Sequence, residues 1–326
     1  MKSNALLFPC DVELLSMIEY IDFGDYTISG LVVLENSNAF ATDDINIPII
    51  DVTDVKYDAF DNVIVIEPDF YKHSFIENSI KKGKNVIYIG QKEKEDFDFK
   101  RLELISEEQQ ISVPIVFVVG TAPYTEKFQI QLALRKQLLA NGYKVSSIGS
   151  KPYSSLFGFH SFPFFMNENK DDTQKIILFK KYVKCIEMTE QPDLIVIGIP
   201  GAIMAINKKH HFDYGVTAYM VSQAVAGDYV IMNMLYGKKY TTEQLEELSK
   251  VCKYRLNFEV DSFHLSNAWL DPSTLKDDQL RIIKLGKKEY DQNVDRLYDL
   301  MNPTDMDRVY EDMITKLASY NVNQIF

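Results

Sequence analysis

The feature that most constrains the fold is an alternation of short apolar runs with segments of helical periodicity. The apolar runs are rich in valine and isoleucine, and those at 113–119 and 194–198 contain no charged residue. Strands have such uniformly apolar sequences when helices cover both faces of a parallel sheet, because neither face then meets water. The sequence therefore predicts an α/β fold built on parallel sheets.

The expected elements follow from the same alternation. The first half predicts strands at 5–9, 28–34, 63–67 and 85–90, and helices at 11–21 and 70–82. The second half predicts strands at 113–119, 144–148, 194–198 and 228–234, and helices at 126–141 and 242–252. Asp11 is expected to cap its helix, and Gly83 to follow a helix end in the left-handed conformation. Charges at helical spacing in the last 50 residues predict C-terminal helices.

A highly charged stretch at 91–110 separates the two halves. The chain has 326 residues, enough for two domains that each bury a core. We expect residues 1–108 to form a Rossmann-like α/β domain with a parallel sheet. Residues 109–326 are expected to form a second parallel-sheet domain that ends in a helical tail.

Charge and cysteine usage limit the classes of partner. Lys and Arg number 35 against 47 Asp and Glu, which gives a net charge of −12. Such a surface repels phosphate backbones and anionic lipids, so neither nucleic acid nor membrane is expected as a partner. No apolar stretch approaches the roughly 20 residues that span a bilayer. Three scattered cysteines without a C-x-x-C pair suit a reducing compartment, so we expect a cytoplasmic protein without disulfides or a zinc knuckle.

The segment from Gly120 to Gln129 carries the strongest functional signal. A buried strand runs into Gly120-Thr121, a short loop follows, and Lys127 stands at the start of a helix. This is the arrangement of a phosphate loop, in which backbone N–H groups and the helix N-terminus cradle phosphate and the lysine neutralises it. An ordinary strand–turn–helix is the alternative interpretation of the same letters.

Two requirements of a working phosphate loop are missing from this segment. The position before the lysine is normally glycine, because the backbone passes close to the phosphates; here it is Glu126. A hydroxyl that holds Mg²⁺ normally follows the lysine, but Phe128 and Gln129 stand there. The second domain is thus expected to be P-loop NTPase-like with a degenerate loop, with no cofactor, and with at most weak binding of ATP or another nucleotide.

A longer order of motifs marks a resemblance to a known family. The motifs are Gly120-Thr121, Lys127-Phe128, Gln131-Leu132 to Arg135, Gly149-Ser150 to Pro152, and the strand 192–201. The chain resembles two-domain P-loop proteins loosely labelled NAD-dependent epimerase/dehydratases, a family that includes D-glutamate N-acyltransferases. More narrowly, it looks like a divergent clostridial branch of peptide maturation system proteins, encoded in gene clusters for ribosomally made, modified peptides.

The departures from that family lie at the expected ligand-facing end. Where the family has G-T-E-P, this chain has Gly149, Ser150 and Lys151; where it has G-S-Q-S-G, this chain has Gly198, Pro200 and Gly201 around Ile199. These six residues are expected to line the remaining cleft. If the two loops face each other, Glu126 and Lys151 are placed to form an ion pair that fills the emptied site.

Four other features were weighed as sites. Asp193 precedes its strand and is interpreted as a turn residue. His210-His211 point in different directions in regular structure and lack a third ligand, so no metal site is expected. Cys10 is interpreted as a small buried residue, against the alternative of a thiol whose pKa is lowered by a helix N-terminus. The aromatic stretch 153–165 fits equally an apolar contact surface and core.

These observations leave two functions open. The first is an accessory protein, without assigned catalytic residues, that binds a precursor peptide or a peptide-modifying enzyme during maturation of a ribosomally synthesised peptide. The alternative is a transferase that depends on a nucleotide or an acyl donor and acts on an amino acid or peptide. Fold alone does not separate them, so whether the chain is an enzyme stays open, as does a homo-oligomeric state.

Overall fold

The computed structural model describes residues 3–34, 46–95, 97–237, 239–286, 288–289 and 293–318. The chain divides into two compact units. The first unit comprises Met1–Asp98 and Lys151–Phe164, and the second comprises Phe99–Ser150 and Phe165–Phe326. These units are defined by which residues contact one another. The predicted boundary near residue 108 between independently folding domains stays a prediction.

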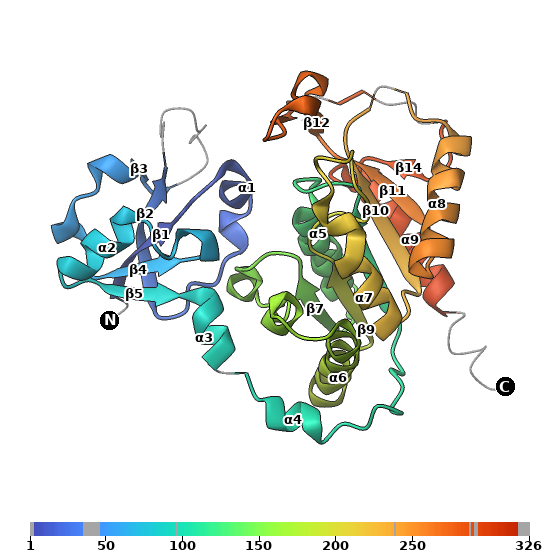
Figure 1. Cartoon of the computed structure of the whole chain (residues 1–326), viewed down its shortest axis with the longest axis horizontal. Coiled ribbons are helices and arrows are strands. Elements are labelled where there is room, and N and C mark those ends of the chain that lie inside the picture. Colours follow the sequence, from blue (N-terminus) through green and yellow to red (C-terminus); the bar gives the residue numbers. More distant parts are fainter. Residues whose placement is uncertain are drawn as a thin grey trace. The chain divides into compact units, whose positions relative to one another are not determined.

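The first unit is built on a parallel sheet of order β3-β2-β1-β4-β5 (Figure 1). The strands of this sheet are β1 (Ser3–Phe8), β2 (Tyr26–Val33), β3 (Ile49–Asp51), β4 (Asn62–Val65) and β5 (Asn85–Tyr88). The short β8 (His160–Ser161) lies in the 151–164 segment and is not part of this sheet. The helices of this unit are α1 (Val12–Leu15), α2 (Ser74–Lys81) and α3 (Ile89–Glu95). Apolar side chains of β1, β4 and α2 form the core on one face of the sheet.

Most predictions for the first unit are confirmed. The four predicted strands are present to within three residues at each end, and Gly83 has the expected positive φ of 73°. Asp11 caps as expected, since its Oδ1 accepts the N–H of Leu14 at 2.7 Å. The helix expected over 11–21 is wrong beyond Leu15, because the chain passes into a separate 3-10 turn at Ile18–Tyr20. In the charged stretch 91–110, Asp96 lies outside the described residues.

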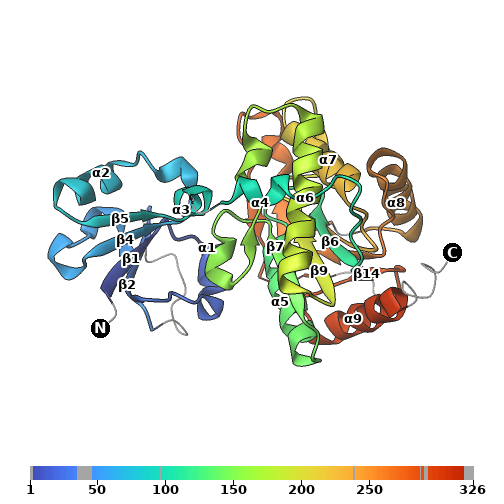
Figure 2. The ribbon, with the colours of Figure 1, turned by 90° about the horizontal axis from the view of Figure 1, so that it is seen from below.

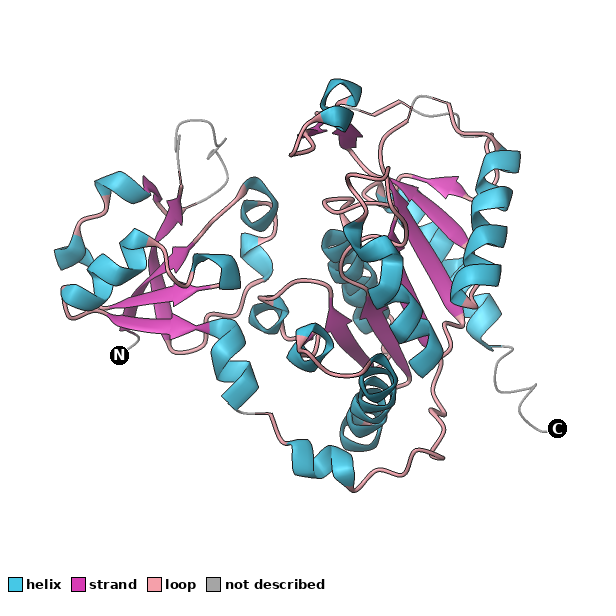
Figure 3. Ribbon diagram, in the orientation of Figure 1, coloured by secondary structure: helices cyan, strands magenta, loops and turns pink. Residues whose placement is uncertain are grey.

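The second unit contains a larger parallel sheet, whose strands follow the order β14-β11-β10-β6-β9-β7. They are β6 (Ile115–Gly120), β7 (Val145–Gly149), β9 (Leu194–Gly198), β10 (Tyr229–Met234), β11 (Ser262–Leu265) and β14 (Leu297–Tyr298). The strands β12 (Ala268–Leu270) and β13 (Ile282–Lys284) pair antiparallel beside it. Figure 3 shows the strands of both units in magenta.

Helices cover both faces of the second sheet. The helices of this unit are α4 (Phe99–Glu103), α5 (Lys127–Ala140), α6 (Asp172–Glu190), α7 (Val216–Ala224), α8 (Thr242–Leu256) and α9 (Pro303–Ala318). Figure 2 shows α5 and α9 on one side of the strands and α7 and α8 on the other. The apolar residues of α5 and α9 share one core with β6, β9 and β10. Among the described residues, no helix has the length and apolar character needed to cross a bilayer.

The second unit confirms the α/β prediction, including its C-terminal helix. The strand expected at 194–198 spans the same residues as β9, and the other three predicted strands lie within two residues of β6, β7 and β10. The expected C-terminal helix is confirmed as α9, and the short strands β13 and β14, which were not expected, precede it. Helix α6 and strand β11 were not expected from the sequence.

The aromatic stretch 153–165 contributes mainly to cores. Tyr153, Phe157, Phe159 and Phe165 are each at most 4% exposed. Phe162 and Phe164 are half-buried. The core interpretation is therefore confirmed for the four buried rings, and these rings are not available as an exposed contact surface.

This burial predicts that Phe157→Ala destabilises the protein by about 3–5 kcal/mol, because a buried phenyl ring is replaced by a cavity. The measurement is the free energy of unfolding from urea titration. The control is Ile80→Ala on α2, whose side chain is 54% exposed; its expected change is about 0.5 kcal/mol or less. Equal stability of Phe157→Ala and wild type would contradict the core assignment.

Candidate functional site

The loop between β6 and α5 combines a close turn at Gly120 with two non-glycine residues of positive φ. A Cβ on Gly120 would lie 2.6 Å from Oγ1 of Thr125, so the close turn requires glycine. Tyr124 and Glu126 adopt positive φ values of 61° and 60°, and the Glu126 side chain makes no capping hydrogen bond to α5. Alternation of left-handed residues in such a loop turns successive N–H groups toward one concave side.

Lys127 is held by backbone carbonyl groups on both sides of the loop. Its Nζ donates to the carbonyl oxygen of Ala122 at 3.1 Å and to that of Gly201 at 3.0 Å. A backbone hydrogen bond from Ile203 N–H to Gly120 O, 2.9 Å long, joins the same two loops. The predicted loop residues after β6 and the predicted cleft residue Gly201 are thus brought together.

Glu126 is the residue that departs most from a working loop, and its carboxylate is fixed away from water. Its Oε2 accepts the N–H of Asn267 at 3.0 Å and lies 3.0 Å from Nε2 of His264. Nζ of Lys288 lies 3.8 Å from the same oxygen. The side chain of Glu126 is only 7% exposed.

The hydrogen bonds of His264 define its protonation state. Its Nδ1 accepts the N–H of Leu300 at 3.0 Å, so this nitrogen carries no proton. Nε2 therefore carries the proton and donates it to Glu126. Complete burial lowers the pKa of His264, against the opposing effect of the Glu126 hydrogen bond, and keeps the ring neutral. Burial alone would raise the pKa of Glu126, but the His264 hydrogen bond, Lys288 and the Asn267 N–H together lower it.

Lys288 extends this network toward β14. Its Nζ donates to Leu265 O at 2.8 Å and to Oδ1 of Asp299 at 2.5 Å. The network formed by Glu126, His264, Asn267, Lys288 and Asp299 is called the Glu126 anchor below. It ties the start of α5 to the segments that follow β11 and β14, and none of its members other than Glu126 was expected from the sequence.

The expected Mg²⁺ position offers no hydroxyl. Phe128 is fully buried, and the buried Oε1 of Gln129 has no hydrogen-bond partner among the described residues. The described residues also contain no cluster of three or more His, Cys, Asp or Glu side chains able to hold a metal.

The cleft residues of the second unit meet at Gln131 on α5. Gln131 donates from Nε2 to Ile148 O at 2.9 Å and accepts the N–H of Ser150 at 3.1 Å. A Cβ on Gly198 would lie 2.0 Å from its Oε1, so glycine is needed where β9 ends. Gln131 thus bonds the residues on either side of Gly149, at the end of β7, and its amide lies against Gly198, at the end of β9. The Q-L motif was its signal in the sequence, although no role followed from it.

The proposed Glu126–Lys151 ion pair is wrong. Glu126 is held in the Glu126 anchor, and Nζ of Lys151 instead lies 2.7 Å from Oε2 of Glu13 within the first unit. The two residues that depart from the family pattern, Glu126 and Lys151, therefore have different partners.

The remaining sequence candidates have structural roles. Oδ2 of Asp193 accepts the N–H of Lys144 at 2.7 Å, so this carboxylate links the starts of β7 and β9. His211 accepts the N–H of Asp213 through Nδ1 at 3.3 Å. Burial raises the pKa of the Cys10 thiol to about 12, so the buried-residue interpretation is confirmed and a lowered thiol pKa is wrong.

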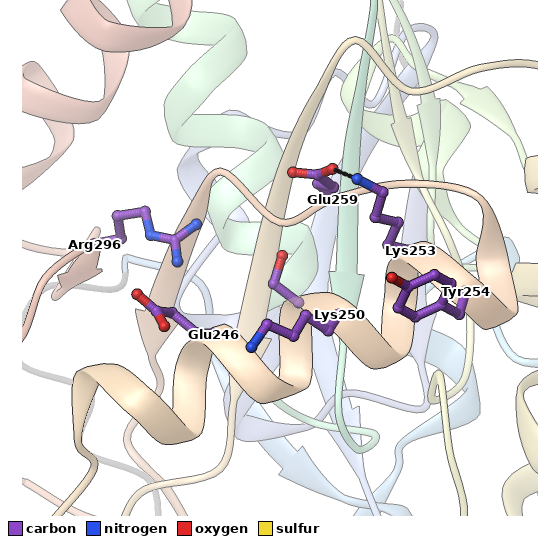
Figure 4. Close-up of a pocket in the computed structure, with 7 residues that line it drawn as sticks. Glu246, Lys250, Lys253, Tyr254, Glu259 and Arg296 are labelled. Carbon is purple, nitrogen blue, oxygen red and sulfur yellow. Dashed lines mark hydrogen bonds and ion pairs between the residues drawn. The ribbon is translucent and has the colours of Figure 1, made fainter.

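A separate surface pocket of about 340 Å³ lies beside α8 (Figure 4). It is lined by Glu246, Ser249, Lys250, Lys253, Tyr254, Glu259 and Arg296. Its cations already have acidic partners: Lys253 pairs with Glu259 and Lys250 with Glu247. Arg296 has one as well, since its Nε lies 3.6 Å from Oδ2 of Asp295.

Comparison with known proteins supports the fold. A DUF1611 family protein from Anabaena variabilis aligns with a TM-score of 0.55 and 11% identity, over 85% of this chain and 91% of that chain. A pseudomurein peptide ligase type C from Methanothermus fervidus aligns with a TM-score of 0.31 and 11% identity, over 80% of this chain and 44% of that chain. No protein-family model matches the sequence, and no curated protein matches it significantly. The chain has a two-domain α/β fold of the Rossmann and P-loop-like class.

The Glu126 anchor predicts a loss of stability at acidic pH. The folded pKa of His264 is lowered below its ordinary value of 6.5, so the unfolded chain binds more protons once the pH falls below about 6.5. The contribution of Glu126, whose folded pKa is also lowered, is lost at still lower pH, below its ordinary value of 4.5. His264→Gln should remove the first of these two losses.

The measurement is the free energy of unfolding of wild type and of His264→Gln at pH values from 7.5 to 5.5. The quantity compared is the loss of this free energy between the two ends of the range. The control is the exposed His211→Gln, whose pH dependence should follow wild type. Parallel curves for wild type and His264→Gln would show that His264 is not held neutral by its surroundings.

Proposed function

We propose that the chain is an accessory protein in the maturation of a ribosomally synthesised, modified peptide. In this proposal it binds a precursor peptide or a peptide-modifying enzyme, and its phosphate loop serves as a structural element. The sequence resemblance described above supports the choice of a peptide partner. The single observation that supports a structural loop is that its two charges are satisfied inside the protein: Glu126 by the Glu126 anchor, and Lys127 by the carbonyl groups of Ala122 and Gly201.

The energetic argument compares a phosphate ligand with these internal partners. A hydrogen bond to a charged group contributes about 1.5–3 kcal/mol. A phosphate that recruits Lys127 must compensate for two such bonds before it gains affinity. Glu126 also places a Cβ at the position where the backbone of a working loop passes closest to phosphate.

A transferase that uses a nucleotide or an acyl donor is the second candidate. The observation that favours it is the preserved loop backbone, with the close turn at Gly120 and left-handed Tyr124 and Glu126. The neighbouring genes discriminate between the two functions. A precursor peptide and a modifying enzyme beside this gene favour the accessory role, whereas genes of amino-acid breakdown favour the transferase.

The structural-loop proposal predicts negligible stabilisation by nucleotide. With Kd above the millimolar range, about 1 mM ATP with Mg²⁺ stabilises by about 0.4 kcal/mol or less. The corresponding change in melting temperature is about 1 °C or less. The measurement is thermal unfolding with and without ATP, and Lys127→Ala is the control. A clear shift in wild type that disappears in Lys127→Ala would refute a structural loop.

A second prediction concerns repair of the loop. Glu126→Gly combined with Gln129→Thr should restore measurable binding of ADP or pyrophosphate, because it returns the close backbone approach and the hydroxyl for Mg²⁺. Isothermal titration calorimetry measures the binding. Glu126→Gln combined with Gln129→Thr is the matched control, since it keeps a side chain at the position that needs glycine.

Circular dichroism must show that both double variants are folded, because the repair also removes the carboxylate of the Glu126 anchor. A folded Glu126→Gly, Gln129→Thr protein that binds neither ligand would show that Glu126 is not what prevents binding.

A further inference from the structure

The hairpin of β12 and β13 crosses the carboxyl edge of the second sheet. It comprises residues 268–284, called the arm below, and is drawn in orange in Figure 1. The arm follows β11, whereas its tip is bonded to residues 207 and 209, which follow β9. Strands β10 and β6 lie between β11 and β9 in the sheet. The arm therefore passes over the carboxyl ends of β10 and β6, where the phosphate loop begins.

Two side chains of the loop after β9 hold the tip of the arm. Nδ2 of Asn207 donates to Leu275 O at 3.0 Å, and Nζ of Lys209 donates to Lys276 O at 2.9 Å. The same Nζ lies 2.7 Å from Oδ1 of Asp278, a side chain that is 97% exposed. An ion pair so open to water is weak and is screened by salt. These interactions are called the latch below.

The arm contributes little to the core of the second unit. Ala268 and Thr274 are buried, and every other residue of the arm is half-buried or exposed. A segment with few buried apolar groups separates from the body at a lower free energy than a core element does. Its own backbone bonds hold it together as a hairpin, among them Asp271 N–H to Arg281 O at 2.9 Å. The arm can therefore move as one unit.

Glu126 holds both roots of the arm. At the first root, Asn267 N–H donates to Oε2 of Glu126 at 3.0 Å, and Asn267 O accepts the N–H of Leu285 at 2.8 Å. Beyond the second root, Nζ of Lys288 lies 3.8 Å from the same carboxylate oxygen. Glu126 stands at the start of α5, so the base of the arm is fixed to the phosphate loop itself.

We propose that the arm is a hinged lid over the phosphate loop. The Glu126 anchor is its hinge, and the latch holds its tip closed. Opening breaks the latch and leaves the bonds within the hairpin and those at its roots intact. The lid controls the access of other molecules to this edge of the sheet, whether the loop beneath it is structural or binds a nucleotide.

The test measures the position of the tip in the full chain by double electron–electron resonance. Spin labels are attached at Gln279→Cys in the tip and Glu311→Cys on α9, both exposed, in a Cys185→Ser background that leaves only buried cysteines. Lys209→Met should raise the ratio of open to closed arm about tenfold, because it removes the charged donor of the latch. About 1 M NaCl should shift the labelled wild type in the same direction, since salt screens the exposed pair.

The matched control is Lys250→Met on α8, whose exposed ion pair with Glu247 lies outside the arm, and its distance distribution should equal that of wild type. Hydrogen exchange should show that the β12–β13 bonds stay protected in Lys209→Met, because the arm moves without unfolding. Equal distance distributions for Lys209→Met and wild type would overturn the proposal, as would loss of that protection. If Lys209→Met does not fold, the salt titration of wild type decides, and distances that salt leaves unchanged would overturn the lid.

Discussion

The position of the phosphate loop depends on how the protein compensates one buried carboxylate. Glu126 occupies a left-handed position at the start of α5, and its charge is nearly removed from water. Such a charge is tolerated only when hydrogen bonds and an opposite charge surround it. The Asn267 N–H, the His264 ring and the Lys288 ammonium supply these, and they come from segments that follow β11 or belong to it. The loop, the first turn of α5 and this edge of the sheet are therefore fixed together.

Internal compensation changes what the loop can do. In a working phosphate loop the ligand provides the negative charge that the lysine and the N–H groups face. Here the loop supplies a carboxylate of its own, which faces the β11 edge, while Lys127 spans to the loop after β9. Both charges at the start of α5 therefore have partners inside the protein.

The sequence predicts the strands well because their signal is local. The run at 194–198 has no competing interpretation, and a glycine followed by a lysine seven residues later locates the loop. The Glu126 anchor could not be predicted from the sequence, because His264 and Asn267 lie 138 and 141 residues from Glu126 along the chain. A single histidine inside a short strand gives no sign of which loop it faces. Helix α6 was missed because half-buried side chains surround much of it and blur its periodicity.

A glutamate near a strand end has opposite surroundings in the two units. Glu126 has three partners and a lowered pKa, whereas Glu67 has no partner among the described residues and a raised pKa of about 7. Folding can satisfy a buried charge with its own groups, and then nothing remains for a ligand to contribute. The two glutamates differ because β11 and the segment after it bring hydrogen-bond donors to Glu126, whereas no described residue donates one to Glu67.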